Sequence, residues 1–418
     1  MKSSFPLMAA IALFLLSLCF LKPTTARADQ PPPPPPPSSP PAVFVLRAGK
    51  LIDPETGTAA ENQVIVVEGA KIKAVGAADK IVVPAGAQVI DLSGDTVLPG
   101  LFDCHTHLCL TLTPKRDHGD ADYNGYIYTT AYRALQGSVN ARTMLEAGFT
   151  TVRDVGNSAN FADTDLRKAV ENGLIPGPTI VNSGPIIAPY GGQVQLQPEK
   201  RVLGEPEYRY ADTRDELLKA IRENIHFGAK VIKIVVDGQP YIYSPEDIRF
   251  IVEEAGRAGR KVCAHCQTQV GAHNAVLGGV ASVEHGWRLA DDDLKLMKRK
   301  GIVLVNGSGP ALIQAQAIGV TLAFGTDCFG EVSAENTRGM QAIRFIDRFV
   351  QANIPPADIL RSLTVNAARL LGADSQRGAI RAGLHADIVA VKGNPLANID
   401  ALKSVVFVMK DGVVYRSH

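Results

Sequence analysis

The sequence predicts an α/β protein in which a (β/α)8 TIM barrel carries a small β-sandwich domain formed from both ends of the chain. Three observations support this prediction. Eight apolar, strand-like runs alternate with amphipathic segments through the middle of the chain, β-rich segments flank this block on both sides, and the 418 residues exceed the roughly 250 that one such barrel uses.

The first 28 residues are predicted to form a cleaved secretory signal peptide. Lys2 precedes the apolar run 5–21, and Ala26 and Ala28 give the small-residue pattern of a signal-peptidase site. An uncleaved membrane anchor is the alternative, although the run is shorter than the ~20 residues of a spanning helix. We therefore expect an exported, periplasmic or secreted protein with no stable membrane span after cleavage.

Residues 29–42 form a predicted proline-rich linker. Their run "PPPPPPPSSPPA" cannot pair as a strand or continue a helix, so a stiff polyproline II spacer is expected. Residues 43–97 then read as short strands with Gly, Pro and Asp at the turns, and residues 382–418 repeat this pattern. These two segments are predicted to build the composite β-sandwich domain, which leaves residues 98–381 for the barrel.

The central block contains eight candidate barrel strands. In chain order they are "LFDCHTHL", "TTVRDV", "PTIVNSG", "VIKIVV", "KVCAHC", "SVEHG", "IVLVNGS" and "LAFGTD". Helical segments lie between them, such as 131–148 and 213–228, each ending in glycine as a helix C-terminus often does. Strands that alternate with helices predict parallel β/α units.

The charge balance excludes some classes of partner. Lys and Arg number 43 against 42 Asp and Glu, so no long-range field would attract nucleic acid or an anionic membrane. We expect a small-molecule partner, and self-association into a homo-oligomer stays open.

His105 and His107 are the first candidate metal ligands. Residues two apart in a strand point to the same side, so both imidazoles can face the barrel interior. Alone, such a pair is more often two partly exposed polar residues at a strand end than a metal site.

Other polar residues on the remaining strands favour the metal site. His265, His285 and Asp327 end the fifth, sixth and eighth strands, and Lys233 lies inside the fourth. Active sites of such barrels are built at the C-terminal ends of the strands, and imidazole and carboxylate are ligands of zinc. An ammonium group is no ligand, but burial favours the neutral amine, which can react with carbon dioxide to give an anionic carbamate.

At this point the chain resembles the amidohydrolase superfamily over nearly its whole length after the proline-rich linker. The resemblance rests on "GLFDCHTHL", "VIKIVVDG", "CAHC", "VEHG" and "FGTD", followed by "LTVNAARLLG", "RGAIRAGLHADIVAVKGNPL" and "VFVMKDGVVYR". Within the superfamily, the chain is most similar to the imidazolonepropionase-like group that includes secreted Xaa-Pro dipeptidases.

The resemblance implies a binuclear metal-dependent hydrolase that cleaves the amide bond of a dipeptide or N-acyl amino acid. Hydroxide activated by two divalent ions, expected to be zinc, would attack the carbonyl, and Asp327 would act as base and then acid. The implied ligands are His105, His107 and Asp327 for one ion, His265 and His285 for the second, and carboxylated Lys233 between them.

Three residues are candidates for substrate contact. Tyr241 and Tyr243 follow the fourth strand, where a phenol could reach a carbonyl, although tyrosines in loops also simply pack. Gln193 follows paired glycines at a position where relatives often carry histidine, so a substrate contact there would be altered.

One departure from the resemblance leaves two alternatives open. Only twelve residues, "GPALIQAQAIGV", separate Ser308 from Thr321, where relatives have a longer loop and a full helix. This predicts either a more open cleft or a non-catalytic, decayed member. A third alternative is a cyclic amidase of the imidazolone or hydantoin type.

Overall fold

The computed structural model describes residues 42–417 except 157–158, 195 and 239. The predicted signal peptide and residues 29–41 of the predicted linker lie outside this part of the chain. Every helix that the structure describes is too short or too polar to cross a membrane.

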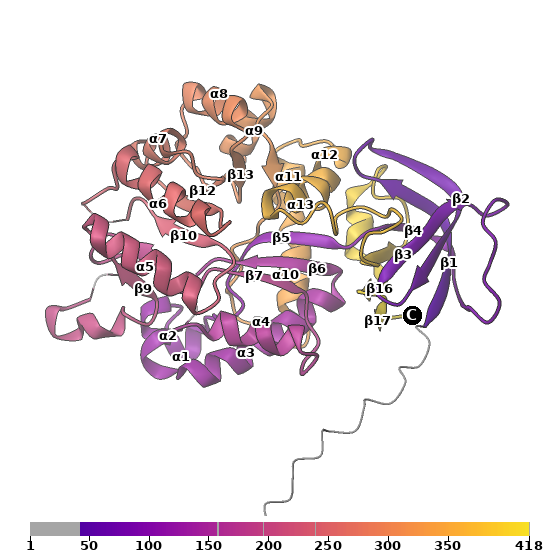
Figure 1. Ribbon diagram of the computed structural model, residues 1–418, viewed down its shortest axis with the longest axis horizontal. Helices are drawn as coiled ribbons and strands as arrows, with labels where there is room; N and C mark the ends of the chain where they lie inside the picture. The colour runs from indigo at the N-terminus through magenta and orange to yellow at the C-terminus, as the bar shows by residue number, and fades with distance from the viewer. Residues whose placement is uncertain (1–41, 157–158, 195, 239, 418) are drawn as a thin grey trace, which may run out of the picture. The chain divides into compact units, whose positions relative to one another are not determined.

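Strands from both ends of the chain form one seven-stranded sheet, in the order β17-β16-β15-β4-β1-β2-β3 (Figure 1). Its central strand β4 pairs in parallel with β1 and antiparallel with β15, which joins the two ends of the chain. The strands are β1 (Val43–Asp53), β2 (Thr58–Glu68), β3 (Lys71–Ala77), β4 (Gln88–Pro99), β15 (Ile388–Val391), β16 (Val405–Lys410) and β17 (Val413–Arg416).

This sheet differs from the two-layer sandwich that we expected. Because β15 hydrogen-bonds to β4, the C-terminal strands extend the N-terminal sheet instead of stacking on it. The edge strand β3 returns to the C-terminal segment through a bridge between Lys71 and His385. Leu46, Ile65 and Phe407 pack together in a core that the curled sheet encloses.

All eight strands predicted for the middle of the chain are present, and they lie in two sheets. One has the order β5-β6-β7 and the other β14-β13-β12-β11-β10-β8-β9, and every pair in both is parallel. The eight are β5 (Leu101–Thr106), β6 (Phe149–Asp154), β7 (Thr179–Asn182), β10 (Ile232–Val235), β11 (Val262–Cys266), β12 (Ser282–His285), β13 (Val303–Val305) and β14 (Leu322–Ala323). Two short strands, β8 (Ile186–Ala188) and β9 (Tyr208–Tyr210), were not expected.

Backbone hydrogen bonds connect these two sheets at both ends. The amide of Cys104 in β5 donates to Phe324 O after β14, at 2.8 Å. At the other end, the amide of Lys230, just before β10, donates to Asn182 O in β7, at 2.7 Å. The residues at the C-terminal ends of the strands are thereby held near one another.

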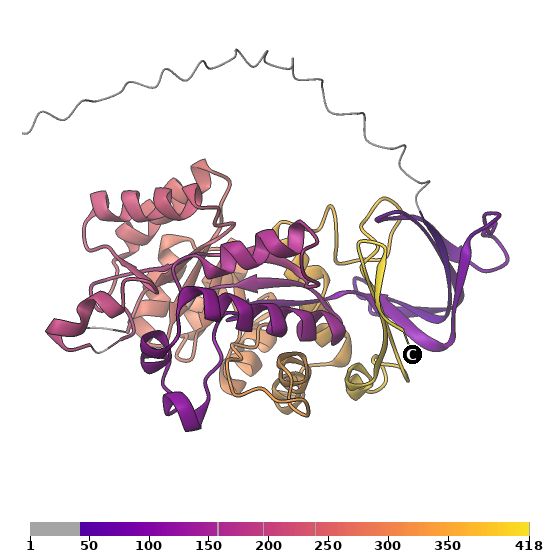
Figure 2. The same ribbon diagram turned by 90° about the horizontal axis from the view of Figure 1, so that it is seen from below.

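Helices lie around the parallel strands (Figures 1 and 2). Local sequence explains their starts: Thr213 and Glu216 form a reciprocal capping box at α5, and the Ser244 side chain caps α6 before Pro245. The helices are α1 (Pro114–Asp117), α2 (Ala121–Ile127), α3 (Thr130–Glu146), α4 (Ala162–Glu171), α5 (Arg214–His226), α6 (Pro245–Arg257), α7 (Gln269–Gly278), α8 (Asp291–Lys300), α9 (Gly309–Ile318), α10 (Arg338–Arg344), α11 (Ile346–Gln351), α12 (Pro356–Ser362) and α13 (Val365–Leu371), with 3₁₀ turns at η1 (Pro198–Leu203) and η2 (Ile399–Lys403).

The short segment after Ser308 contains a full helix. Helix α9 has ten residues, and the Ser308 hydroxyl accepts a hydrogen bond from the amide of Ala311 at its start. The crossover from β13 to β14 is therefore complete. Only its first link is short, since residues 306–308 alone connect β13 to α9.

Candidate functional site

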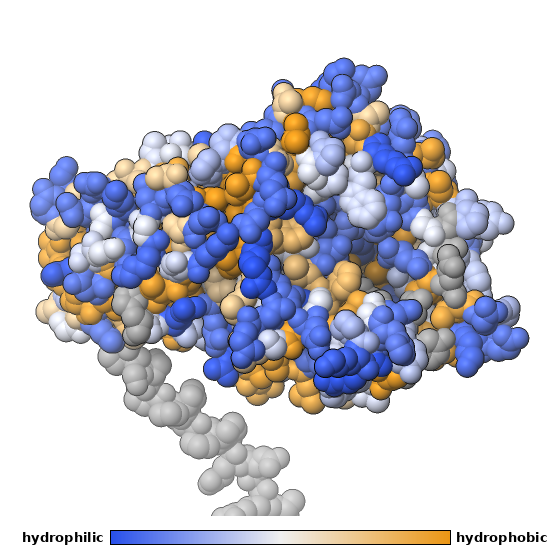
Figure 3. Space-filling model, turned by 180° about the vertical axis from the view of Figure 1, so that it is seen from behind, coloured by the Kyte–Doolittle hydropathy of each residue, from blue (hydrophilic) through white to orange (hydrophobic). Residues whose placement is uncertain are grey.

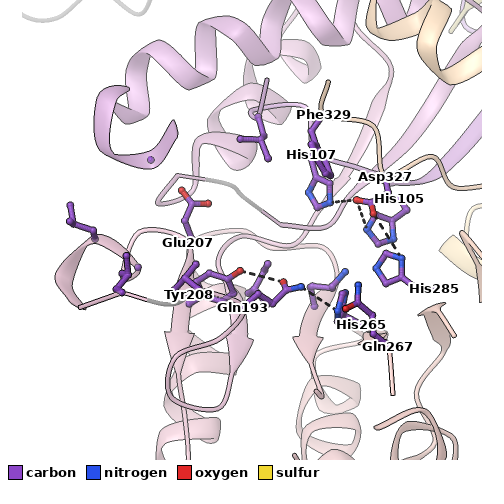
Figure 4. A pocket seen from close by; sticks show the side chains of 18 residues that line it. His105, His107, Gln193, Glu207, Tyr208, His265, Gln267, His285, Asp327 and Phe329 are labelled. Carbon is purple, nitrogen blue, oxygen red and sulfur yellow. Dashed lines mark hydrogen bonds and ion pairs between the residues drawn. The ribbon is translucent and has the colours of Figure 1, made fainter. Parts of the chain in front are cut away.

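A cavity of about 250 Å³ lies at the C-terminal ends of the parallel strands (Figure 4). Gln193 lines it. So do all six side chains predicted as metal ligands, which are His105, His107, Lys233, His265, His285 and Asp327. Residues that are up to 222 positions apart in the sequence thus face one space.

The backbone at three strand ends adopts left-handed conformations that aim side chains into this region. The φ angles are 68° at His285, 52° at Asn306 and 55° at Asp327, which end or follow β12, β13 and β14. For residues other than glycine such angles cost free energy and concentrate at functional sites. Each turns the chain sharply just after its strand.

Asp327 is the centre of the polar cluster, as Figure 4 shows. Its Oδ1 lies 2.8 Å from His107 Nε2 and 3.5 Å from His105 Nε2. Its Oδ2 lies 3.9 Å from His285 Nδ1. One candidate ligand atom from each of His105, His285 and Asp327 lies within 4.8 Å of the others, which is close enough for the three to share one cation.

The outer nitrogens of two histidines are already occupied by protein groups. His105 Nδ1 lies 2.7 Å from Glu284 Oε2, and His107 Nδ1 lies 3.0 Å from the carbonyl of Gly156. Gly156 has φ 138°, and a Cβ there would lie 2.6 Å from Ile186, so only glycine fits. Both rings are thereby fixed with Nε2 toward Asp327, the arrangement by which proteins orient metal-binding histidines.

Glu284 and Arg153 form a buried ion pair behind the site that we did not predict. Arg153 Nη2 lies 2.7 Å from Glu284 Oε1, and the side chain of Glu284 is 0% exposed. Ser282 Oγ also donates to this carboxylate, at 2.5 Å. The available signal was a charged residue inside each of two apolar strand runs, "TTVRDV" and "SVEHG".

The electrostatic surroundings keep most of the imidazoles neutral. Burial lowers the pKa of His285 to about 4, and burial also holds the pKa values of His105 and His265 well below the ordinary range. Although burial opposes ionisation of Asp327, the neighbouring histidines hold its pKa below the usual value. Neutral imidazole and ionised carboxylate are the forms that bind a metal.

Lys233 reaches the same cavity from inside β10. The residue is only 2% exposed. Within the part of the chain that the structure describes, its ammonium group has no hydrogen bond or ion pair. A buried amine without a counter-charge is costly, and such lysines serve as reactive amines.

Gln193 lies in the cavity, as its candidate role requires. Its Nε2 lies 3.2 Å from His265 Nε2, and its Oε1 accepts a hydrogen bond from the Tyr208 hydroxyl at 3.3 Å. Tyr208 lies in the unexpected strand β9 and lines the cavity, so the sequence analysis missed it.

Tyr241 and Tyr243, by contrast, do not line this cavity, and their predicted role is corrected. The Tyr243 hydroxyl donates to the carbonyl of Ala211 at 2.7 Å, inside the core. Tyr241 is 74% exposed. Both residues instead line a separate surface depression beside Tyr190.

Tyr243→Phe should therefore lower the free energy of unfolding by about 1–2 kcal/mol, because it leaves the Ala211 carbonyl without its buried donor. Tyr241→Phe, on the surface, is the matched control and should stay within about 0.5 kcal/mol of wild type. Urea unfolding curves measure both. A Tyr243 variant with unchanged stability and a raised KM would restore the original prediction.

The chain is similar to several known proteins. The family model described as "Amidohydrolase family" matches residues 96–415. The chain belongs to the amidohydrolase family. Ochratoxinase of Aspergillus niger is 30% identical over 382 residues, covering 77% of this chain and 75% of that protein. Imidazolonepropionase of Geobacillus kaustophilus is 24% identical, covering 83% of this chain and 91% of that protein.

Solved structures of family members are also similar. A Xaa-Pro dipeptidase with methionine bound in its active site has a TM-score of 0.80 and 27% identity, covering 90% of this chain and 100% of that one. The A. niger ochratoxinase structure has a TM-score of 0.77 and 27% identity, covering 91% and 97%. This family member is therefore a hydrolase that acts on amide bonds.

Proposed function

We propose that the protein is a binuclear metal-dependent hydrolase that cleaves the amide bond of a dipeptide or N-acyl amino acid. The observation that carries this proposal is the convergence of four histidines, Lys233 and Asp327 on one cavity. Imidazole and carboxylate are the donors that zinc prefers, and few structural roles require so many buried polar groups at one point.

We also propose that the parallel strands close into the (β/α)8 barrel. The hydrogen bonds from β5 to the residues after β14, and from before β10 to β7, support closure, because they join the two sheets at both ends. The similar Xaa-Pro dipeptidase structure supports it as well. Closure would explain why the strand ends meet around one cavity.

The donor set fits two divalent cations. His105, His107 and Asp327 would hold one ion, His265 and His285 the second, and carboxylated Lys233 would lie between them. The fit rests on neutral imidazoles, on the two rings fixed through their outer nitrogens, and on an amine without a counter-charge. Bound divalent metal would supply Lewis acidity and lower the pKa of water from about 15.7 to about 7.

The protein's own residues would perform the proton transfers. Asp327 is ionised and lies at the centre of the cluster, so its carboxylate can take a proton from water and deliver it to the leaving nitrogen. His107, held by Gly156, keeps that carboxylate oriented. Gln193, held by Tyr208, offers an amide group at the opposite wall for the substrate.

The Xaa-Pro dipeptidase match supports a linear amide as the first candidate. That structure is 27% identical and its name states a dipeptide substrate, whereas the imidazolonepropionases match at 22–25%. The imidazolonepropionase matches nonetheless keep ring opening as the second candidate. The complete helix α9 and the full set of six side chains argue against a non-catalytic member.

Export is a further part of the proposal and rests on Lys2, the apolar run 5–21 and the small residues before Asp29. Intact mass of the mature protein should show an N-terminus at Asp29. A mature chain that begins at Met1 would contradict cleavage.

Metal analysis tests the function. Protein purified after growth with zinc and bicarbonate should contain about two divalent ions per chain, a chelator should abolish hydrolysis of N-acyl amino acids and dipeptides, and zinc should restore it. A panel that includes hydantoins and imidazolones separates the two candidates. Protein without bound metal, or hydrolysis that survives the chelator, would contradict the proposal.

A further inference from the structure

A second cavity, of about 680 Å³, opens beside the first. The two share His285, Asp327 and Phe329 in their linings, so they meet at the proposed reaction centre. The second cavity is otherwise bounded by the residues after β12 and β13, the loop after β14, and helices α10 and α11. Asn306, the first residue of the short link 306–308, lines it next to β13.

Two arginines lie on the wall of this cavity. Arg344 ends α10 and Arg348 lies four residues later in α11, a spacing that places both side chains on one face of the nearly continuous helix. Arg344 donates to Asn336 Oδ1. Within the described part of the chain, neither guanidinium has an ion pair with a carboxylate.

Arg348 is held in place by neutral groups. Its Nη1 donates to Asn306 Oδ1 at 3.3 Å, and its Cζ lies 4.1 Å from the centroid of the Phe345 ring. Asn306 Nδ2 in turn lies 3.2 Å from His285 Nδ1. The guanidinium is thus positioned two hydrogen bonds from the proposed reaction centre, and among the described residues it forms no ion pair with a carboxylate.

The charge of the lining favours an anionic ligand. The two arginines supply its positive charge; the lining also holds Asp327, which belongs to the proposed metal site, and Glu331, which like both arginines is exposed to solvent. A planar guanidinium with several free N–H groups binds a carboxylate through two parallel hydrogen bonds. On the face drawn in Figure 3, hydrophilic residues interrupt the hydrophobic ones, and the surface is hollowed near its middle.

We propose that this second cavity binds the leaving amino acid of the substrate, with Arg348 paired to its free α-carboxylate. The inference rests on the proposed amide hydrolysis and names the residue that would recognise the free carboxyl group of the substrate's leaving amino acid. The acyl part then occupies the first cavity, whose lining includes apolar Leu110, Ile186 and Leu203. Arg348 is a specificity-determining residue, since it contacts the substrate away from the bond that breaks.

Trp287 gives a direct signal for this cavity. It is the only tryptophan in the sequence, it lines the second cavity, and it is 51% exposed. A ligand that enters beside it should change its fluorescence. Suitable probes are 3-phenylpropanoate and 3-phenylpropan-1-ol, because neither is an amide and they differ mainly in the carboxylate.

The metal-loaded full chain would be titrated with both probes while Trp287 emission is recorded. We expect 3-phenylpropanoate to bind at least about tenfold more tightly than the alcohol, and Arg348→Gln to weaken the acid about 10- to 100-fold without changing the alcohol. Arg299→Gln, on the exposed face of α8, is the matched control and should change neither. Equal binding of acid and alcohol, or acid binding that Arg348→Gln leaves unchanged, would overturn the proposal.

Kinetics separate this inference from the proposed function. Arg348→Gln should raise KM for N-acetyl-L-phenylalanine at least about tenfold with kcat within about threefold, and should spare N-acetyl-L-phenylalaninamide. If Arg348→Gln does not fold, Arg348→Lys should still weaken the acid selectively, because it loses the planar fork. If N-acetyl-L-phenylalanine and its amide are hydrolysed with equal KM, and Arg348→Gln changes neither value, only the proposed role of Arg348 is contradicted. Selective acid binding without any hydrolysis would sink only the proposed function.

Discussion

Asp327→Asn should lower kcat for hydrolysis of an N-acyl amino acid about 10²- to 10⁴-fold, the range that general acid–base groups contribute. The carboxylate lies 2.8 Å from His107 Nε2, and the histidines keep it ionised in spite of its burial. Asparagine has nearly the same shape but cannot accept a proton and return it. Steady-state kinetics with the amine product quantified would measure the loss.

Metal content decides how that result is interpreted. The variant should retain bound metal, since the four histidines and Lys233 remain, so the loss belongs to proton transfer. Asp292→Asn, at a highly exposed position in α8, is the matched control and should match wild type. Near-normal turnover by Asp327→Asn with metal retained would rule out the carboxylate as the acid and base.

The parallel part of the fold could be predicted because each strand has a local signal. All eight apolar runs form strands, and their alternation with amphipathic helices follows from the need to bury both faces of a parallel sheet. Strands β8 and β9 were not predicted, because each has only three residues and a hydrophobic pattern cannot be recognised over so short a run. The single curled sheet was not predicted, because it depends on the pairing of β15 with β4, which joins segments nearly 300 residues apart.

The candidate ligands could be predicted for a different reason. His265 and His285 lie at the C-terminal ends of β11 and β12, and Asp327 follows β14. Parallel strands bring their C-terminal ends together whatever the loops do. No such rule gives the direction of a loop, and the predicted substrate contact of Tyr243 was therefore not found. Its hydroxyl donates a hydrogen bond to the Ala211 carbonyl in the core. The segment after Ser308 is short, as the sequence shows, but its ten residues 309–318 are sufficient for a full helix.

Glu284 shows what pattern alone cannot reveal. It contacts Arg153 and His105, which lie 131 and 179 positions away, and only the assembled strands bring them together. Asn306 and Arg348, 42 positions apart, are a second case. His105 could be predicted from the sequence, whereas its partner Glu284 and the contact between Asn306 and Arg348 depend on tertiary structure.

Glu284→Gln should lower the free energy of unfolding of the metal-free protein by about 3–5 kcal/mol. Its side chain is 0% exposed and pairs with Arg153, whose side chain is 2% exposed, so the variant leaves a buried cation without its counter-charge. The change also removes the carboxylate behind His105, which should weaken metal binding about 10- to 100-fold. Guanidinium unfolding curves and competition with a metal indicator measure the two effects.

The loss of stability in Glu284→Gln should come from the unpaired charge of Arg153 rather than from lost packing contacts. Glu253→Gln, at an exposed position on α6, is the matched control and should change stability by less than about 0.5 kcal/mol. Adding Arg153→Met to Glu284→Gln should recover part of the lost stability, because no buried cation then remains, whereas metal affinity should stay low, because His105 still lacks its carboxylate partner. A double variant less stable than either single variant would show instead that the two side chains act mainly by packing. Normal metal affinity in Glu284→Gln would show that His105 binds the metal without a carboxylate partner.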